Sequence, residues 1–459
     1  MHPILHRQVL QRDHAGTARG FLELPKPGNF KVVATSEDGE IELTVRRTND
    51  RLVEIDGLPT GGPYTITATD ESGSLAATVA DVLVGDLWVL AGQSNMQGIG
   101  EISERLPALP KAAMLSFDKT WKPAVEPLHR FWETKDSAQY KMSPHLGFGI
   151  TKEELDRAYE QLHAQDAVEP VGGVGPGAFF ADSLIRLCGV PIGLLPCALS
   201  GSPLDMWQKD FCERAGDSFE DTLFGDLVDR VQLAGARITG VLWYQGESDA
   251  LPGTAETYLQ NFEKFVDDVR LSLGDPGLPF ITVQLANTEN IDEWTREDAW
   301  NRLRDSQRMA GEVIENVDVV ASADLPRNDH VHLSGKGQRA LGVRLAKAAT
   351  RRTLGCRSEI QVPALEAIDV GSSSLTVRFR GINGRLRLSG GELSKAFTVT
   401  GRQVVGARLS DSNVEVFLDG PCRGGEEVSF GVGFQPAATL LDDEGFCVPV
   451  FGPMRLDRK

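Results

Sequence analysis

Ser94 lies in a sequence context that is typical of a catalytic serine. Ser94 lies in the run 92–96 (GQSNM), directly after the apolar segment 87–91, which is typical of a buried strand. A serine at a tight turn between a strand and a helix presents its hydroxyl at the sheet edge, near main-chain N–H groups that can hold an oxyanion. A serine hydroxyl is a weak nucleophile at neutral pH and needs a base. Ser94 is therefore predicted to be a nucleophile whose base comes from elsewhere in the chain.

The predicted base is His332. It lies in the run 329–337 (DHVHLSGKG), which follows the apolar segment 317–321 and precedes a helix that Ser334 can cap. Asp329, three residues before the histidine, can reach Nδ1 of the imidazole and fix its orientation. Ser94 and His332 both follow strands of one predicted parallel sheet, so they can meet at its carboxyl edge.

Two further segments are predicted to stabilise an oxyanion. Gly201 follows the predicted strand 192–196, and a glycine there lets its main-chain N–H approach a substrate closely. Gln245 ends another predicted strand, and its amide is predicted to donate to the same oxygen. The predicted oxyanion hole thus combines the N–H groups of Ser94 and Gly201 with the Gln245 side chain.

Four neighbouring side chains are predicted to bind substrate. Gln93 and Asn95 flank the serine, while the rings of Trp207 and Tyr244 either stack on a sugar or pack in the core. No cluster of histidine, cysteine and acidic residues has the spacing of a zinc or calcium site. No metal and no cofactor are therefore predicted.

The elements that position these residues fall into three regions. Residues 1–80 alternate apolar and polar side chains and predict a β-sandwich-like module, and residues 356–459 predict a second β module. Between them, residues 81–355 alternate apolar strands with amphipathic helices, which predicts an α/β domain with a mostly parallel sheet. Residues 101–175 fit this alternation poorly and are interpreted as a long excursion near the active site.

The expected strands are short. They are 30–34, 41–45 and 64–69 in the first module, 87–91, 192–196, 238–244, 280–285 and 317–321 in the α/β domain, and 375–379, 397–400, 414–418 and 428–432 in the last module.

The composition of the chain limits the classes of partner that it is expected to bind. The net charge of −18 and the pI near 5.0 disfavour nucleic acid and anionic membrane surfaces. No apolar run resembles a leader or a membrane span, which predicts a soluble, cytoplasmic chain, with secretion or a periplasmic location left open. Among six scattered cysteines, Cys422 and Cys447 are the pair considered for a disulfide. The oligomeric state is left open.

These segments together resemble the ordered blocks of the SGNH hydrolase superfamily, and more closely the sialate O-acetylesterase-like group and the related acetyl xylan esterases. The resemblance rests on residues 92–96, 175–177, 201, 243–248 and 329–337, and extends more weakly to 10–13, 61–65 and 82–86. It implies a three-layer αβα (flavodoxin-like) domain. It also implies a serine esterase that removes acetyl groups from a carbohydrate.

The resemblance assigns Ser94 as nucleophile, Gly201 as glycine donor, Asp329 as acid and His332 as base. Gln245 replaces the asparagine of the superfamily's third block. In this branch Glu247 is an alternative acid partner for the histidine, so both carboxylates stay candidates.

Other functions remain open at this stage. The substrate could be an acetylated xylan or pectin, or the protein could be a general carboxylesterase. From other classes come a carbohydrate-binding protein without activity and a glycosidase that uses Glu247 and Asp329. Loss of activity on removal of Ser94 separates the esterase from the glycosidase.

Overall fold

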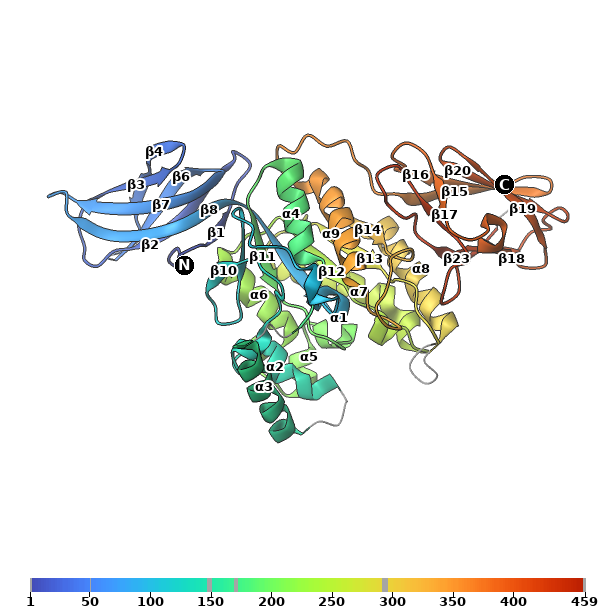
Figure 1. Cartoon of the computed structure of the whole chain (residues 1–459), viewed down its shortest axis with the longest axis horizontal. Coiled ribbons are helices and arrows are strands. Elements are labelled where there is room, and N and C mark those ends of the chain that lie inside the picture. The colour runs from blue at the N-terminus through green and yellow to red at the C-terminus, as the bar shows by residue number, and fades with distance from the viewer. Residues whose placement is uncertain (1, 50, 147–150, 169–171, 291–295, 457–459) are drawn as a thin grey trace.

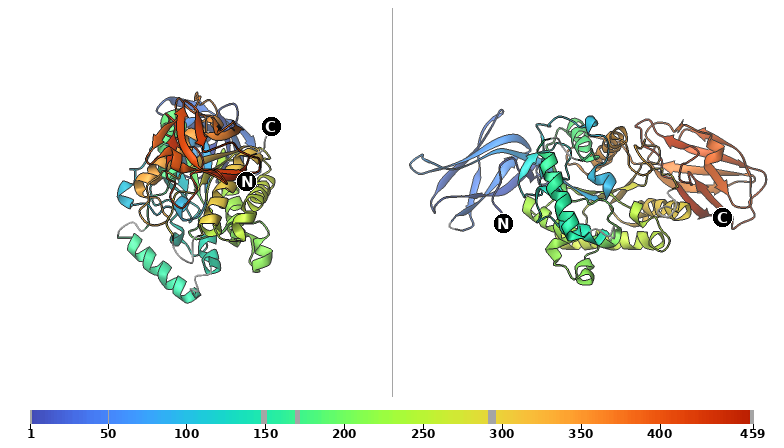
Figure 2. Two further views of the ribbon diagram at one scale, coloured as in Figure 1. Left: turned by 90° about the vertical axis from the view of Figure 1, so that its right-hand side faces the viewer. Right: turned by 60° about the horizontal axis from the view of Figure 1, so that its bottom comes forward.

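The computed structural model describes residues 2–49, 51–146, 151–168, 172–290 and 296–456 (Figure 1). Its buried apolar residues form three clusters, one in the N-terminal strands, one in a central α/β domain and one in the C-terminal strands. The two strand modules lie at opposite ends of the central domain, which gives an elongated molecule (Figure 2). Among the described helices, none has the length and apolar character needed to cross a membrane.

The central sheet has the strand order β10-β9-β11-β8-β12-β13-β14. All neighbouring strands in this order pair in parallel except β10, which pairs antiparallel with β9 at one edge of the sheet. The strands are β8 (Leu75–Gly92), β9 (Ala112–Leu115), β10 (Trp121–Pro123), β11 (Ile192–Pro196), β12 (Gly240–Tyr244), β13 (Phe280–Gln284) and β14 (Val317–Ala321). Parallel pairing brings the carboxyl ends of β8, β11, β12 and β14 to one edge, as the sequence predicts.

Helices alternate with these strands. They are α1 (Ser94–Gln97), α4 (Gly177–Cys188), α5 (Phe211–Ala215), α6 (Leu223–Ala234), α7 (Thr254–Leu273), α8 (Glu297–Val313) and α9 (Gly335–Ala349). α4 packs on α9, and α7 packs on α8. In α7 an apolar stripe is buried, including Tyr258, Phe262 and Val266. Ser334 caps α9 by accepting the N–H of Gly337.

The segment 101–175 differs from its interpretation as a pure excursion. It contributes β9 and β10 to the central sheet before forming α2 (Ala138–Met142) and α3 (Lys152–Asp166). The two strands are three to four residues long, and β9 is built from alanine, methionine and leucine, which carry little strand propensity. A pattern based on alternation or on β-branched residues therefore misses them.

The N-terminal module shares a strand with the central domain. β8 passes through residue 80 without a break, so the predicted boundary falls inside a strand. In the module β8 pairs with β7 (Gly61–Asp70) and β1 (Val9–Gln11), while β3 (Phe30–Ser36) joins β7 to β4 (Gly39–Glu42). A second sheet has the order β2-β6-β5, with β2 (Thr17–Glu23), β6 (Leu52–Pro59) and β5 (Thr44–Arg47). The expected strand 41–45 is thus divided at buried Leu43 between two sheets.

The C-terminal module has its own core and three small sheets. One sheet has the order β15-β16-β20-β19, another β18-β21-β23, and β17 pairs with β22. The strands are β15 (Ala364–Val370), β16 (Ser374–Arg380), β17 (Arg387–Ser389), β18 (Phe397–Val399), β19 (Val404–Ser410), β20 (Asn413–Leu418), β21 (Glu427–Phe430), β22 (Thr439–Leu441) and β23 (Phe451–Arg455).

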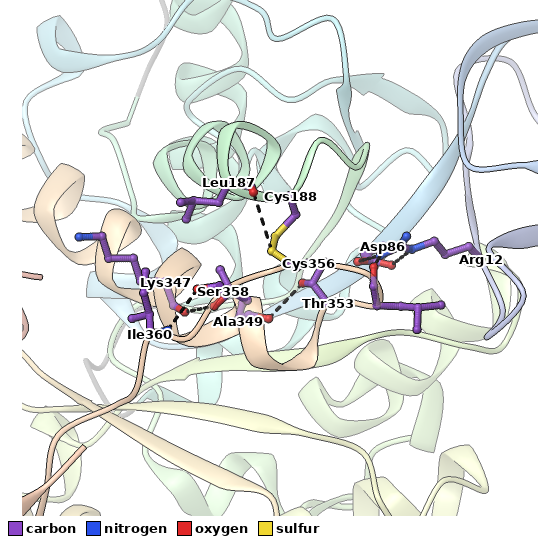
Figure 3. Close-up of a disulfide and its surroundings, with 12 residues drawn as sticks. Arg12, Asp86, Leu187, Cys188, Lys347, Ala349, Thr353, Cys356, Ser358 and Ile360 are labelled. Atoms are coloured by element: carbon purple, nitrogen blue, oxygen red, sulfur yellow. Dashed lines mark hydrogen bonds and ion pairs between the residues drawn. A yellow bond between two sulfur atoms is a disulfide. The ribbon is translucent and has the colours of Figure 1, made fainter. Parts of the chain in front are cut away.

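A disulfide joins Cys188 at the end of α4 to Cys356 in the linker that leads to the C-terminal module (Figure 3). The pairing considered for Cys422 with Cys447 does not form. Cys422 belongs to the core of the C-terminal module, whereas the main chain of Cys447 pairs with Ala321 at the end of β14. Sequence distance misled here, because the bonded pair is separated by 168 residues.

Candidate active site

Ser94 begins α1 at the carboxyl end of β8. The preceding Gly92 has a φ of 128°, and a Cβ there would lie 2.1 Å from the carbonyl oxygen of Tyr244. Only glycine fits this position, because any side chain would collide with β12. The N–H of Gln93 donates to the same Tyr244 carbonyl at 2.9 Å. The turn around the serine is therefore fixed by its neighbour strand.

Three of the predicted residues form a hydrogen-bonded series. The Oγ of Ser94 lies 2.9 Å from Nε2 of His332, and Nδ1 of His332 lies 2.7 Å from Oδ2 of Asp329. His332 and Asp329 come from the loop 327–333, called the histidine loop below. The structure thus brings together the hydroxyl, imidazole and carboxylate that the sequence predicts.

The Asp329 carboxyl is held in its charged form. Partial burial acts to raise its pKa, but the N–H groups of His332 and Val331 and the His332 ring outweigh burial and lower the pKa to about 2. Oδ1 accepts those two N–H groups at 2.7 and 2.8 Å, which leaves Oδ2 for the imidazole. A fixed negative charge at Nδ1 favours the imidazolium that forms when the serine loses its proton.

The second candidate acid, Glu247, has a different partner. Its Oε1 accepts the Asn95 amide at 2.6 Å, and its Oε2 is buried without a hydrogen bond. Burial raises the pKa of the Glu247 carboxyl, against the opposing effects of Asn95 and of nearby His332. The structure therefore gives the contact with His332 Nδ1 to Asp329.

Asn95 connects the serine turn to the histidine loop. Its side chain donates to the carbonyl of Val331 at 3.2 Å and accepts the N–H of Leu333 at 2.9 Å. The Gln338 amide on α9 donates to the main-chain oxygen of Asn95 at 3.0 Å. Asn95 is fully buried, so it positions the loop instead of contacting substrate as predicted.

Gln93 and Gln245 are hydrogen-bonded to each other and to the main chain around the site. The Gln245 nitrogen lies 2.5 Å from Asp249 Oδ2 and 3.2 Å from both Gln93 Oε1 and the Ser202 carbonyl. These acceptors occupy both N–H bonds of the amide, so none remains for the predicted oxyanion contact. Buried Gln93 accepts in addition the N–H groups of Gly246 and Ser248, which replaces its predicted substrate contact.

The remaining predicted residues separate into two groups. Gly201, with a φ of 76°, lies in the turn after β11, and its carbonyl accepts the hydroxyl of Ser248. Trp207 and Tyr244 are 0% exposed, so neither ring is available to a sugar. Trp207 packs edge-to-face on Trp243 and donates to Ser202, which makes it a core residue.

Asp249 was not predicted. It is buried, accepts the N–H of Leu204 at 2.8 Å and binds Gln245. Burial raises its pKa to about 6, although both donors oppose the shift. The only sequence signal is its position two residues after Glu247, which does not reveal a bond to Leu204, 45 residues away.

A hydroxyl, an imidazole and a carboxylate in this order are the groups with which serine hydrolases activate a nucleophile. They lie at the carboxyl ends of parallel strands, where α/β proteins bind ligands. The chain belongs to a family of carbohydrate esterases: the family model described as "Carbohydrate esterase, sialic acid-specific acetylesterase" matches residues 84–156 and 150–351, more than half of the chain. This membership confirms the prediction of a carbohydrate O-acetylesterase.

Individual relatives agree with the family. The chain is 30% identical over 270 residues to a probable carbohydrate esterase of Arabidopsis thaliana, covering 57% of this chain and 89% of the relative. It is 23% identical over 355 residues to human sialate O-acetylesterase, covering 70% of this chain and 64% of the human protein. The crystal structure of a carbohydrate acetylesterase from Xanthomonas citri matches over 100% of both chains, with a TM-score of 0.67 and 21% identity. The last similarity shows a shared fold that includes the flanking strand modules.

Proposed function

We propose that the protein hydrolyses acetyl esters of a sugar through an acetyl-enzyme on Ser94. The observation that carries this proposal is the series from Ser94 to His332 to Asp329, with contacts of 2.9 and 2.7 Å. His332 takes the hydroxyl proton while Ser94 Oγ attacks the acetyl carbonyl. The imidazolium then gives this proton to the sugar oxygen as its bond to the acyl carbon breaks, so the sugar leaves with a free hydroxyl. The neutral imidazole next takes a proton from the water that attacks the acetyl-enzyme and releases acetate.

Main-chain groups supply the proposed oxyanion hole. The N–H groups of Ser94 and Gly201 are the remaining candidates, because the Gln245 amide is bound to Asp249, Gln93 and Ser202. Gln245 then acts through Gln93 by holding the residue that precedes the nucleophile. Removal of one oxyanion donor typically costs about 3 kcal/mol of transition-state stabilisation.

The substrate class follows from the family. We propose an O-acetylated sugar, with O-acetylated sialate as the first candidate because the family model and the human relative carry that description. Xylan-type substrates and simple acyl esters are the alternatives. We also infer that the central domain is a three-layer SGNH-type domain, supported by the parallel sheet and by the separate helix pairs α4–α9 and α7–α8.

The test compares the wild-type protein with Ser94→Ala. Acetate release is measured from p-nitrophenyl acetate, O-acetylated sialate, acetylated xylo-oligosaccharides and acetylated pectin fragments. Ser373→Ala, in the exposed turn before β16, is the matched control. We expect Ser94→Ala to lose at least about three orders of magnitude in kcat/KM while the control keeps full activity.

Retained acetate release in Ser94→Ala would overturn the acetyl-enzyme on Ser94, and sugar cleavage without acetate release in both proteins would favour the carboxylate pair of a glycosidase. Absence of activity in both proteins, with sugars still bound, would favour a carbohydrate-binding protein. The ratio of kcat/KM values across the panel assigns the substrate class.

A further inference from the structure

Thr288, four residues after the end of β13, bonds to two parts of the molecule that are far apart in the sequence. Its main-chain N–H donates to Phe434 in the C-terminal module, and its hydroxyl donates to His330 in the histidine loop. We propose that Thr288 is a positioning residue through which the docked C-terminal module holds the histidine loop in place for catalysis. The role assigned to that loop rests on the proposed function.

The first half of this connection is a docked loop of the module, residues 431–436. Phe434 accepts the N–H of Thr288 at 2.9 Å, and its side chain packs against the central core. On the other side of the loop, Asn301 of α8 accepts the N–H of Gly433, and fully buried Arg304 donates to the Gly433 carbonyl, both at 2.9 Å. The module loop is therefore bound from two directions by the central domain.

The segment 285–288, which connects the end of β13 to Thr288, is held in place at its start. The fully buried Gln284 side chain donates to the carbonyl of Val450 and accepts its N–H, both at 2.9 Å. Arg304 donates to the carbonyls of Leu285 and Ala286. The main chain that leads to Thr288 thus has little freedom while the module is docked.

The second half of the connection reaches the histidine loop. The Thr288 hydroxyl, in a side chain with 0% exposure, donates to the His330 carbonyl at 2.8 Å. Next to it, Asn287 accepts Nε of Arg327, and Arg327 donates to the carbonyl of Asp329 at 2.6 Å. These bonds hold the main-chain carbonyls of Asp329, the residue that orients His332, and of the adjacent His330.

The tip of the histidine loop is solvent-exposed, so hydrogen bonds are its main restraint. Asn328, Asp329 and His330 are all exposed, so apolar packing does not restrain them. Within the loop, the N–H of Asn328 donates to the His332 carbonyl at 3.0 Å and closes the turn. The Asn328 side chain donates to the Ile99 carbonyl at 3.1 Å, so the Thr288 hydroxyl is a second hydrogen bond between the exposed tip and the central domain. A small displacement of a catalytic group from its productive geometry can cost up to about 100-fold in rate.

The experiment compares Thr288→Val, which removes the hydroxyl at similar volume, with Thr288→Ser, which keeps it. Thr350→Val is the control, because Thr350 is also buried and its hydroxyl donates to the Lys347 carbonyl at 2.7 Å, away from the site. Asn301→Ala removes the acceptor for the module loop without touching Thr288 or the histidine loop. Each variant is assayed for kcat and KM on p-nitrophenyl acetate and for thermal unfolding. Hydrogen exchange is followed by mass spectrometry in peptides that cover residues 325–334.

We expect Thr288→Val to lower kcat about 5- to 50-fold with KM changed less than about twofold, and to raise exchange in the histidine loop. Thr288→Ser restores most of kcat, Asn301→Ala shows the same changes at smaller size, and Thr350→Val shows neither. The proposal is overturned if Thr288→Val keeps wild-type kcat and loop exchange, or if Thr350→Val lowers kcat equally. If the wild-type protein lacks esterase activity, the proposed function fails, while the exchange data still decide whether Thr288 holds the loop.

Discussion

The two strand modules are attached to the central domain in different ways. The N-terminal module shares β8 with the central sheet, and β1 pairs with β8 up to Gly85. At about 3.3 Å per residue, the part of β8 from Gly85 to Gly92 is about 23 Å long, so that junction lies roughly 25 Å from Ser94. The C-terminal module instead docks through loops, and its Phe434 contacts Thr288 beside the histidine loop. A shared strand gives continuity of the fold, whereas loop docking places a module next to the chemistry.

Because the two junctions lie at different distances from the site, we expect one to influence the stability of the fold and the other to influence catalysis. The N-terminal junction contains a buried ion pair between Arg12 and Asp86 at the amino-terminal side of the sheet. The C-terminal junction borders the loop that supplies Asp329 and His332. We therefore expect changes at the first junction to affect unfolding, and changes near the second to affect kcat.

The largest effect is expected inside the histidine loop itself. Asp329→Asn should lower kcat about 10³- to 10⁴-fold, because a neutral amide no longer stabilises the imidazolium or fixes the same tautomer. Glu247→Gln is the matched comparison and should cost about tenfold or less, since Glu247 bonds to Asn95 instead of His332. Steady-state kinetics on p-nitrophenyl acetate measure both. A larger loss in Glu247→Gln than in Asp329→Asn would make Glu247 the acid partner of the histidine.

The N-terminal junction provides the opposite test. Arg12→Met leaves the Asp86 carboxylate, which is 2% exposed, without its bidentate partner and should destabilise the fold by roughly 3–5 kcal/mol. Thermal unfolding followed by circular dichroism measures the loss. At a temperature where the variant stays folded, we expect kcat within about twofold of wild type.

The double variant Arg12→Met with Asp86→Leu should recover much of the lost stability, because it removes the unpaired charge. A large decrease in kcat for folded Arg12→Met would contradict the contrast between the junctions, since it would couple the N-terminal module to the site.

Sequence patterns predicted the parts of the site that carry local signals. Ser94 and His332 each follow a buried strand, and Asp329 lies within the same loop as its partner, so type and spacing were sufficient. The supporting contacts carry no such signal, because Asn95 bonds to Leu333 and Gln93 to Gln245 across more than 150 residues. Packing decides such pairs, and for the same reason the burial of Trp207 could not be distinguished from a role in sugar stacking.

The fold shows the same limit. Strands with strong apolar runs were predicted within a few residues, whereas the short β9 and the passage of β8 across the module boundary were not. Both depend on neighbouring strands that pair with them, β11 for β9 and β1 and β7 for β8. Local propensity does not encode this pairing.

The disulfide near the C-terminal linker should have a smaller effect than the ion pair. Cys188→Ser with Cys356→Ser releases the linker that leads to the C-terminal module, and we expect a loss of roughly 2–4 kcal/mol in stability. The bond does not touch Thr288 or the histidine loop, so kcat should stay within about twofold. Thermal unfolding with and without dithiothreitol measures the effect in the wild-type protein, and the double variant should not respond to the reductant.

Alkylation of the denatured, unreduced protein provides an independent check of that bond. Peptides that contain Cys188 and Cys356 should stay unlabelled until a reductant is added. Labelling of both without reductant would show that the two thiols are not joined. Disulfides persist in oxidising compartments, so the result for protein taken directly from its source also tests the cytoplasmic location predicted from the sequence.

The smallest expected effect is on the pH dependence of stability and concerns Glu126 in the segment 101–175. This segment is a third part of the molecule that contacts the site. Glu126 is buried and accepts the N–H groups of Leu128 and Gly175, and Gly175 packs against the carbonyl of Met96 beside the nucleophile. Burial raises the pKa of Glu126 from 4.5 to about 8, although its N–H donors oppose the shift. The folded protein therefore holds this proton more tightly than the unfolded chain.

The sign of the pH effect follows from that shift. The stabilisation from the bound proton is fully present below pH 4.5 and is lost as the pH rises through about 8. Glu126→Gln cannot titrate, so its unfolding temperature should fall less steeply than that of the wild type between pH 5 and pH 9, by a few degrees in total. Scanning fluorimetry at pH 5, 7 and 9 measures the difference, with Glu160→Gln on the exposed face of α3 as the control. Parallel curves for Glu126→Gln and wild type would show that Glu126 is ionised throughout. A loss of kcat beyond about threefold at pH 7 would mean that this segment, like the C-terminal module, holds the site in place.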